Sequence, residues 1–169
     1  SGTFLGVRYR TDLEYWRDKQ ILYFPKKELK SIAVEYPDKS DASFTVDLKP
    51  LRVGPNPGSK KINKIRLEKY VSFYNDLFCA GFENNYALKD TFLRTFKPFA
   101  KVKISSTQGE EHKVDIYYQP MNKTSHSVIT IDGKDYDGDS FLGWYDEKDL
   151  MVITSGTAQK ILRERREFF

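Results

Sequence analysis

The stretch INKIRLEKYVSFYNDLFCAG, residues Ile62 to Gly81, has the clearest helical periodicity in the chain and decides the fold that the sequence predicts. Its apolar residues recur three and four positions apart, which is typical of an amphipathic helix with one buried stripe. The stripe comprises Ile62, Ile65, Tyr70, Phe73, Tyr74, Leu77 and Phe78. Gly81 stands where a glycine ends a helix. Because extended-looking segments lie on both sides, we expect one long helix that covers a sheet.

Alternation of apolar and polar residues predicts one hairpin before this helix and one after it. In the first, Ser31 to Tyr36 and Ser43 to Leu48 are joined by turn-forming residues. In the second, Ala100 to Ser105 and Lys113 to Tyr118 are joined by a turn at Ser106 to Glu110. Further strands are expected at Thr3 to Tyr9 (a strand or an ordered arm), Ser127 to Ile131, Phe141 to Tyr145 and Leu150 to Thr154.

Two shorter helices complete the predicted fold. Asn84 to Phe96 is expected to pack antiparallel to the long helix, because only about six residues connect them. A C-terminal helix is expected from Thr157 to Glu167. The class is therefore α+β, a mainly antiparallel sheet of hairpins and meander packed against one long helix, a second short helix and a C-terminal helix. Residues 1–169 are expected to form a single domain, which could divide only near the irregular residues 50–61 (PLRVGPNPGSKK).

Composition narrows the classes of function. The 169 residues carry 28 basic and 24 acidic side chains, a net charge of +4 without a strong basic block. The single cysteine, Cys79, excludes an intramolecular disulfide and a cysteine-based zinc site. No apolar run reaches the roughly 18 residues that span a membrane. Because the chain begins with Ser1 rather than Met, we expect that an N-terminal leader or anchor has been removed.

An acidic run is the strongest candidate for a metal site. In DGKDYDGD, Asp135, Asp137 and Asp139 alternate after Asp132 and around a glycine. Calcium takes several oxygen ligands from such a tight loop. The spacing matches an EF-hand loop poorly, however, and a turn between strands also favours Asp and Gly. Calcium on Asp135, Asp137 and Asp139 is the only cofactor that the sequence suggests.

No catalytic motif is present. The sequence has no glycine-rich phosphate loop, no G-x-S-x-G elbow and no H-E-x-x-H pair, so it predicts no catalytic residues and favours a protein that is not an enzyme. Cys79 could act as a nucleophile only with His112 or His126 as its base. A small, partly buried structural residue is the favoured interpretation of Cys79.

A basic and aromatic sheet face would suit nucleic acid. Lys101, Lys103 and Lys113 lie on predicted strands beside Tyr117 and Tyr118, and single-stranded nucleic acid binds to such combinations. Lysines that protect a sheet edge from pairing would give the same pattern. Nucleic-acid binding is therefore permitted by the sequence but not indicated by it.

Several segments together carry a resemblance to a known family. They are Tyr9 with Asp18-Lys19 and Ile21, SIAVEY followed by SFTVDL, Lys69-Tyr70-Val71 with Phe73, IDGKDYDGDSFLGWYDEKDLMVIT, and ILRERREFF. On these segments the chain resembles the uncharacterised envelope-associated domains of Bacteroidetes, a domain-of-unknown-function family also found near gliding-type ABC transport genes. The resemblance implies an N-terminal membrane anchor outside this chain, an extracytoplasmic location and no established activity. It supplies no functional residues.

The sequence thus predicts a non-enzymatic extracytoplasmic interaction domain of a membrane-anchored bacterial envelope protein, such as a lipoprotein. Its expected partner is another envelope protein, bound through an exposed sheet edge or through the irregular loop at residues 50–61. Two alternatives stay open. One is a calcium-dependent binding protein or hydrolase that uses the acidic loop at residues 132–139. The other is a nucleic-acid-binding module.

Overall fold

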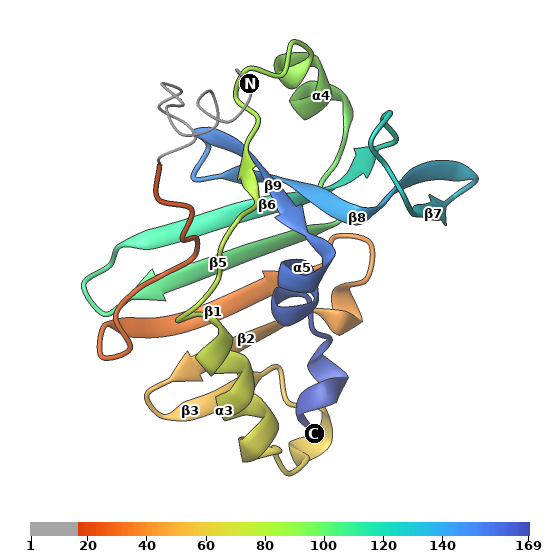
Figure 1. The fold of residues 1–169 in the computed structure, drawn as a ribbon. Coiled ribbons are helices and arrows are strands. Elements are labelled where there is room, and N and C mark those ends of the chain that lie inside the picture. The colour runs from red at the N-terminus through yellow and green to blue at the C-terminus, as the bar shows by residue number, and fades with distance from the viewer. Residues whose placement is uncertain (1–16) are drawn as a thin grey trace, which may run out of the picture.

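A single antiparallel sheet dominates the computed structural model, which describes residues 17–169 (Figure 1). The strand predicted at Thr3 to Tyr9 lies outside the described residues. The sheet order is β3-β2-β1-β5-β6-β8-β9-β4, with β7 paired to β8 beside this path. The strands are β1 (Leu29–Glu35), β2 (Phe44–Leu48), β3 (Leu51–Gly54), β4 (Gly81–Phe82), β5 (Ala100–Ser106), β6 (Glu111–Pro120), β7 (Val128–Ile131), β8 (Lys134–Tyr145) and β9 (Asp149–Thr154).

Both predicted hairpins are confirmed. Ile32 of β1 lies opposite Val46 of β2, and Val102 of β5 lies opposite Val114 of β6, so their alternating apolar residues share one buried face. The sequence did not predict β3, which lies within the irregular segment after β2. Proline excludes a central strand, but β3 is at the edge of the sheet, where proline is tolerated on both sides of a short strand.

The expected α+β class with one long helix is wrong, because the described chain is mostly antiparallel sheet with short helices. Helix α3 spans only Lys64–Phe73 and is capped at its start by the Asn63 side chain, which accepts a hydrogen bond from the Arg66 backbone N–H. After a turn at Tyr74 to Asp76 the chain becomes extended. The backbone N–H of Ile21 donates to the Leu77 carbonyl at 2.9 Å, and a bridge joins Gln20 to Phe78.

Pairing of an extended segment therefore explains why the apolar residues after Tyr74 are buried although they are not helical. Leu77 and Cys79 alternate into the core as a strand-like segment does, whereas Phe78 between them is 46% exposed. Ile65, also assigned to the buried stripe, is 80% exposed on α3. Gly81 does not cap a helix, because it begins β4 and pairs with Val152 of β9.

The other helices are also shorter than expected. They are α4 (Lys89–Thr95) and α5 (Ser155–Ile161), with short 3-10 turns η1 (Ser40–Ala42), η2 (Pro57–Ser59) and η3 (Arg165–Phe168). Helices α3 and α4 lie at opposite ends of the molecule and do not form the predicted antiparallel pair (Figure 1). The predicted C-terminal helix ends at Ile161, and η3 forms a separate turn closed by a reciprocal capping box between Glu164 and Glu167.

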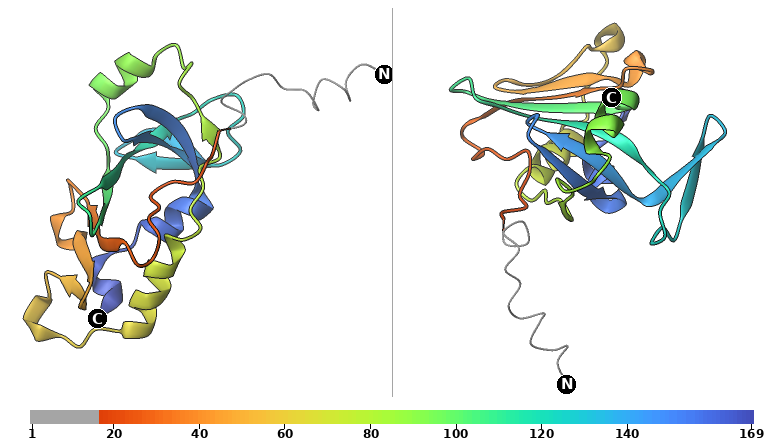
Figure 2. Two further views of the ribbon diagram at one scale, coloured as in Figure 1. Left: turned by 90° about the vertical axis from the view of Figure 1, so that its left-hand side faces the viewer. Right: turned by 90° about the horizontal axis from the view of Figure 1, so that it is seen from above.

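Two hydrophobic cores lie on opposite faces of the sheet. The larger core packs α3, α5 and η3 against β1, β2, β5 and β9, with Leu67, Tyr70 and Phe168 at its centre. The smaller core places Phe92 of α4 over Tyr117 and Leu142 of β6 and β8. Figure 2 shows α4 at one end of the sheet, away from α3 and α5. The helices therefore cover only parts of each face.

The revised position of α3 can be tested with two truncations on the same helix. Leu67 is fully buried, so Leu67→Ala should lower the free energy of unfolding by about 2–5 kcal/mol. The matched change Ile65→Ala, at a largely exposed position, should alter it by less than about 0.5 kcal/mol. Urea denaturation measures both, and similar losses in the two variants would contradict the orientation of α3.

Candidate functional site

The β7–β8 hairpin projects from the body of the sheet (Figures 1 and 2). Its turn consists of Asp132 and Gly133, with φ values of 49° and 75°. Two successive positive φ values are the geometry of a type I′ turn, which favours Asp-Gly in a two-residue hairpin loop. Part of the acidic run is thus explained by turn geometry. The hairpin continues through the pairs Ile131–Lys134 and Ile129–Tyr136.

The three candidate metal ligands act as hydrogen-bond acceptors along this hairpin. Asp137 is buried, and its carboxylate accepts hydrogen bonds from the Ser125 hydroxyl at 2.8 Å and from the Asp139 backbone N–H at 2.7 Å. The Asp139 carboxylate accepts one from the Ser127 hydroxyl at 2.8 Å. Asp135 accepts one from the Thr130 hydroxyl at 2.7 Å. The carboxylates therefore hold the loop before β7 against β8.

This arrangement does not fit a calcium site well. Each carboxylate is directed to a different donor of the protein, and residues 17–169 contain no group of three or more acidic, histidine or cysteine side chains placed to hold an ion. Calcium takes six to eight oxygen ligands around one point. Calcium binding at Asp135, Asp137 and Asp139 stays a prediction, without a common ligand position in the described structure.

Strand β7 has a free edge. It pairs only with β8, and the Gly138 N–H donates to the Ser127 carbonyl at 3.0 Å. Hydrogen-bonded pairs alternate along an antiparallel ladder, so Ile129 and Ile131 bond to β8 while the backbone groups of Val128 and Thr130 point away from it. Within residues 17–169, no other strand pairs with this edge.

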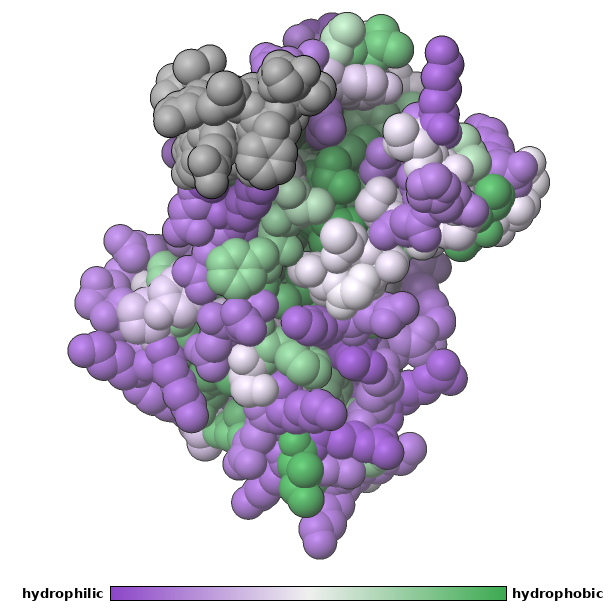
Figure 3. Space-filling view, in the orientation of Figure 1, coloured by the Kyte–Doolittle hydropathy of each residue, from purple (hydrophilic) through white to green (hydrophobic). Residues whose placement is uncertain are grey.

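The edge also lacks the usual protection against pairing. Proteins protect exposed edges with lysine, proline or bulges, but residues 128–131 read VITI, and Val128 is 54% exposed. Figure 3 shows hydrophobic atoms on the hairpin and in the hollow beside it, whereas the surface around α3 is mainly hydrophilic. The sequence predicted a strand here, and its uncharged β-branched run next to Asp-Gly was the signal of an open edge.

A shallow apolar pocket lies near the base of the hairpin. Its volume is about 190 Å³, and Tyr86, Met121 and Leu142 contribute to its walls. Tyr86 and Met121 are among the exposed large hydrophobic side chains of the described chain. Pro120 also lines the pocket and pairs with Tyr136 of β8, which pairs on its other side with Ile129, so the pocket lies across β8 from β7.

The basic sheet face is balanced by carboxylates. Lys103 forms an ion pair with Glu111 at 3.3 Å, and Lys113 forms one with Glu147 at 2.8 Å. Lys101 lies opposite Asp115 in the ladder. Neither tyrosine of the nucleic-acid alternative is presented beside the lysines. Tyr117 shares their face but is buried under α4, and Tyr118 stacks on Phe99 on the opposite face, with ring centroids 4.1 Å apart.

Cys79 occupies a structural position. It is buried, and burial raises the pKa of its thiol, which favours the unreactive protonated form. His112 is bound elsewhere, with its Nδ1 2.8 Å from an Asp146 carboxylate oxygen and its ring stacked on Phe24. In the part of the chain that the structure describes, no hydrogen bond joins Cys79 to either histidine.

The chain was compared with known protein families, curated proteins and solved structures. No family model, curated protein or solved structure matches the chain. Among the described helices, none is long and apolar enough to cross a membrane. The resemblance to the Bacteroidetes envelope domains therefore stays a prediction.

The role of Asp139 as an acceptor predicts a pH-dependent loss of stability. The Ser127 hydroxyl, together with the backbone N–H groups of His126 and Ser127, lowers the pKa of the Asp139 carboxyl. A lowered folded-state pKa stabilises the fold above the unfolded pKa of about 3.9, and this contribution is lost as pH falls through the folded value. Asp139→Asn should therefore unfold at lower temperature than the native protein at neutral pH, and the difference should shrink as the pH falls below the unfolded pKa and through the lowered pKa of the folded state.

Calorimetric melting between neutral pH and acid measures this difference. Asp38→Asn, in the turn after β1, makes the same charge change away from the hairpin and controls for the altered net charge. If Asp139→Asn and Asp38→Asn followed the same pH profile, the carboxylate of Asp139 would have no special role in the hairpin.

Proposed function

We propose that this chain is a non-enzymatic interaction domain that binds an extended segment of another envelope protein by adding it as a strand beside β7. The free edge of β7 supports this mode most directly, since Val128 and Thr130 present backbone donors and acceptors away from β8. Strand addition takes its affinity from such backbone groups and its specificity from neighbouring pockets. The side chains nearest to the added segment are those of β7 itself, and Val128 is the most exposed of its apolar residues.

The hairpin suits this role because its own structure does not depend on the free edge. The buried Asp137 and the hydrogen bonds of Asp139 to Ser127 hold the base of the hairpin. The type I′ turn holds its tip. A strand that is already ordered loses little conformational freedom when a partner binds, so more of the interaction energy contributes to affinity.

The envelope location of the domain is part of the same proposal. Its support is the resemblance of several segments to the envelope-associated domains of Bacteroidetes. Protease treatment of intact spheroplasts, followed by detection of the domain with an antibody, tests it directly. Digestion in intact spheroplasts is expected, and protection until the membrane is lysed would contradict an extracytoplasmic location.

A pair of substitutions at one position isolates the backbone of β7. Thr130→Pro removes the outward N–H, and Thr130→Val keeps it, while both remove the hydroxyl that bonds to Asp135. The partner is first isolated with the native domain and purified. We expect its dissociation constant, measured by interferometry, to rise about tenfold or more for Thr130→Pro and less than about threefold for Thr130→Val. Equal affinities of the two variants would contradict strand addition.

A second pair keeps the test decisive if proline disturbs the hairpin. Val128→Lys places a charge at the edge, and Ile65→Lys makes the same kind of change at an exposed position on α3. Only Val128→Lys should weaken binding, and both should stay within about 0.5 kcal/mol of native stability. In the native complex, hydrogen exchange at the Val128 and Thr130 amides should slow, and protection confined to other elements would exclude β7 as the binding edge.

A further inference from the structure

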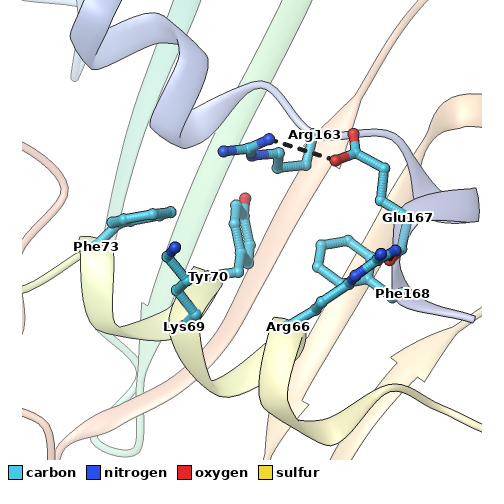
Figure 4. A pocket seen from close by; sticks show the side chains of 7 residues that line it. All are labelled: Arg66, Lys69, Tyr70, Phe73, Arg163, Glu167 and Phe168. Carbon is cyan, nitrogen blue, oxygen red and sulfur yellow. Dashed lines mark hydrogen bonds and ion pairs between the residues drawn. The ribbon is translucent and has the colours of Figure 1, made fainter.

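A cavity of about 210 Å³ lies between α3 and the C-terminal segment, at the other end of the molecule from the hairpin (Figures 1 and 4). Three basic side chains line it. Arg66 and Lys69 come from one face of α3, three residues apart, and Arg163 comes from the link between α5 and η3. One acidic side chain, Glu167, also lines the cavity. The lining residues therefore carry a net charge of about +2 at neutral pH.

The basic groups are only partly neutralised. Arg163 is 3.4 Å from the Glu167 carboxylate, a long ion pair, and the other oxygen of that carboxylate accepts a hydrogen bond from the Glu164 backbone N–H. Arg66 donates to the Glu167 backbone carbonyl at 3.2 Å, which is a neutral acceptor. Lys69 forms no ion pair with any residue of the described chain. Donors therefore stay available at all three basic side chains.

The floor of the cavity is aromatic. Tyr70 and Phe168 are buried, with ring centroids 5.3 Å apart, and Phe73 forms a partly exposed side wall. The Tyr70 hydroxyl turns inward, donates to the Ile161 carbonyl at 3.1 Å and lies 2.7 Å from the Tyr74 hydroxyl. Figure 4 shows the Lys69 amino group and the Arg163 guanidinium beside the Tyr70 ring. The polar groups directed to the cavity are thus mainly basic.

We propose that this cavity binds an oxyanion group, carboxylate or phosphate, of a small solute or of a single lipid headgroup, with the apolar part of that ligand against the aromatic side chains. Guanidinium groups present paired N–H donors that match the oxygens of such anions, and a lysine adds a mobile positive charge. The aromatic floor accepts the apolar part. The volume is below the roughly 300–1,000 Å³ of pockets for drug-sized ligands, so only a small molecule or a single headgroup fits.

Phenyl phosphate is a suitable probe, because it combines the oxyanion with one ring. Calorimetric titration of the whole chain in buffer of low ionic strength should show saturable binding that weakens as chloride is added. Phenol, which has the ring without the anion, should not bind. Arg163→Gln and Lys69→Gln should each weaken the affinity for phenyl phosphate about tenfold.

Two further variants separate a built site from a general charge effect. Lys64→Gln removes the same charge from α3 outside the cavity and should change the affinity less than about twofold. Glu167→Gln removes the one carboxylate but keeps a side chain that can close the capping box, and it should tighten binding a few-fold. A purely structural role of Glu167 would predict no such gain.

Anionic vesicles distinguish the source of the oxyanion. Sedimentation with phosphatidylglycerol vesicles that requires Lys69 and Arg163 would identify a lipid headgroup, whereas binding of phenyl phosphate alone would identify a free solute. No binding of either probe at about 10 mM, or equal weakening by Lys64→Gln and Lys69→Gln, would overturn the assignment.

Discussion

The buried hydroxyl of Tyr70 fixes how α3 packs against α5 and η3. Its ring packs against Phe44 of β2 and Phe168 of η3, and its hydroxyl bonds to Tyr74 and to the Ile161 carbonyl of α5. A buried phenol without partners would cost several kcal/mol, so this group is stable only when α3 and α5 meet at that depth. Helices of seven to ten residues are marginal alone, and their order here comes from such tertiary contacts.

The β7–β8 hairpin and the cavity at α3 lie at different ends of the molecule and differ chemically (Figure 1). The hairpin presents uncharged backbone at an open edge, whereas the cavity at α3 presents basic side chains over aromatic rings. Neither region depends on the other for its geometry, since the hairpin is held by its own carboxylates and the cavity by the core around Tyr70. The two proposed ligands would therefore bind to separate parts of the domain and would not compete directly.

The sequence predicted what depends on neighbouring residues and failed where distant residues decide the structure. The hairpins β1–β2 and β5–β6 follow from local alternation, as does the strand at β7. The long helix was wrong because Leu77 and Cys79 are buried by pairing with the segment at Gln20 and Ile21, which no local pattern reveals. The alternative of a turn for the acidic run is right only for Asp132 and Gly133, because Asp135, Asp137 and Asp139 lie within strand β8. Arg66, Lys69 and Arg163 were missed as a group, because only the packing of α5 and η3 on α3 brings Arg163 near the other two.

The strand order also has a consequence for folding kinetics. The strands β1, β2 and β3 follow one another along the chain, and so do β5 and β6, but β1 and β5 are joined by pairs as distant in the sequence as Leu29 and Ser106. Closing so long a loop costs entropy before the contacts repay it, and non-local strand pairing slows folding. The β1-β2-β3 meander and the β5–β6 hairpin are thus expected to form early and the β1–β5 pairing late. During synthesis, one edge of β1 would stay unpaired until β5 emerges. A chaperone could bind to that exposed edge.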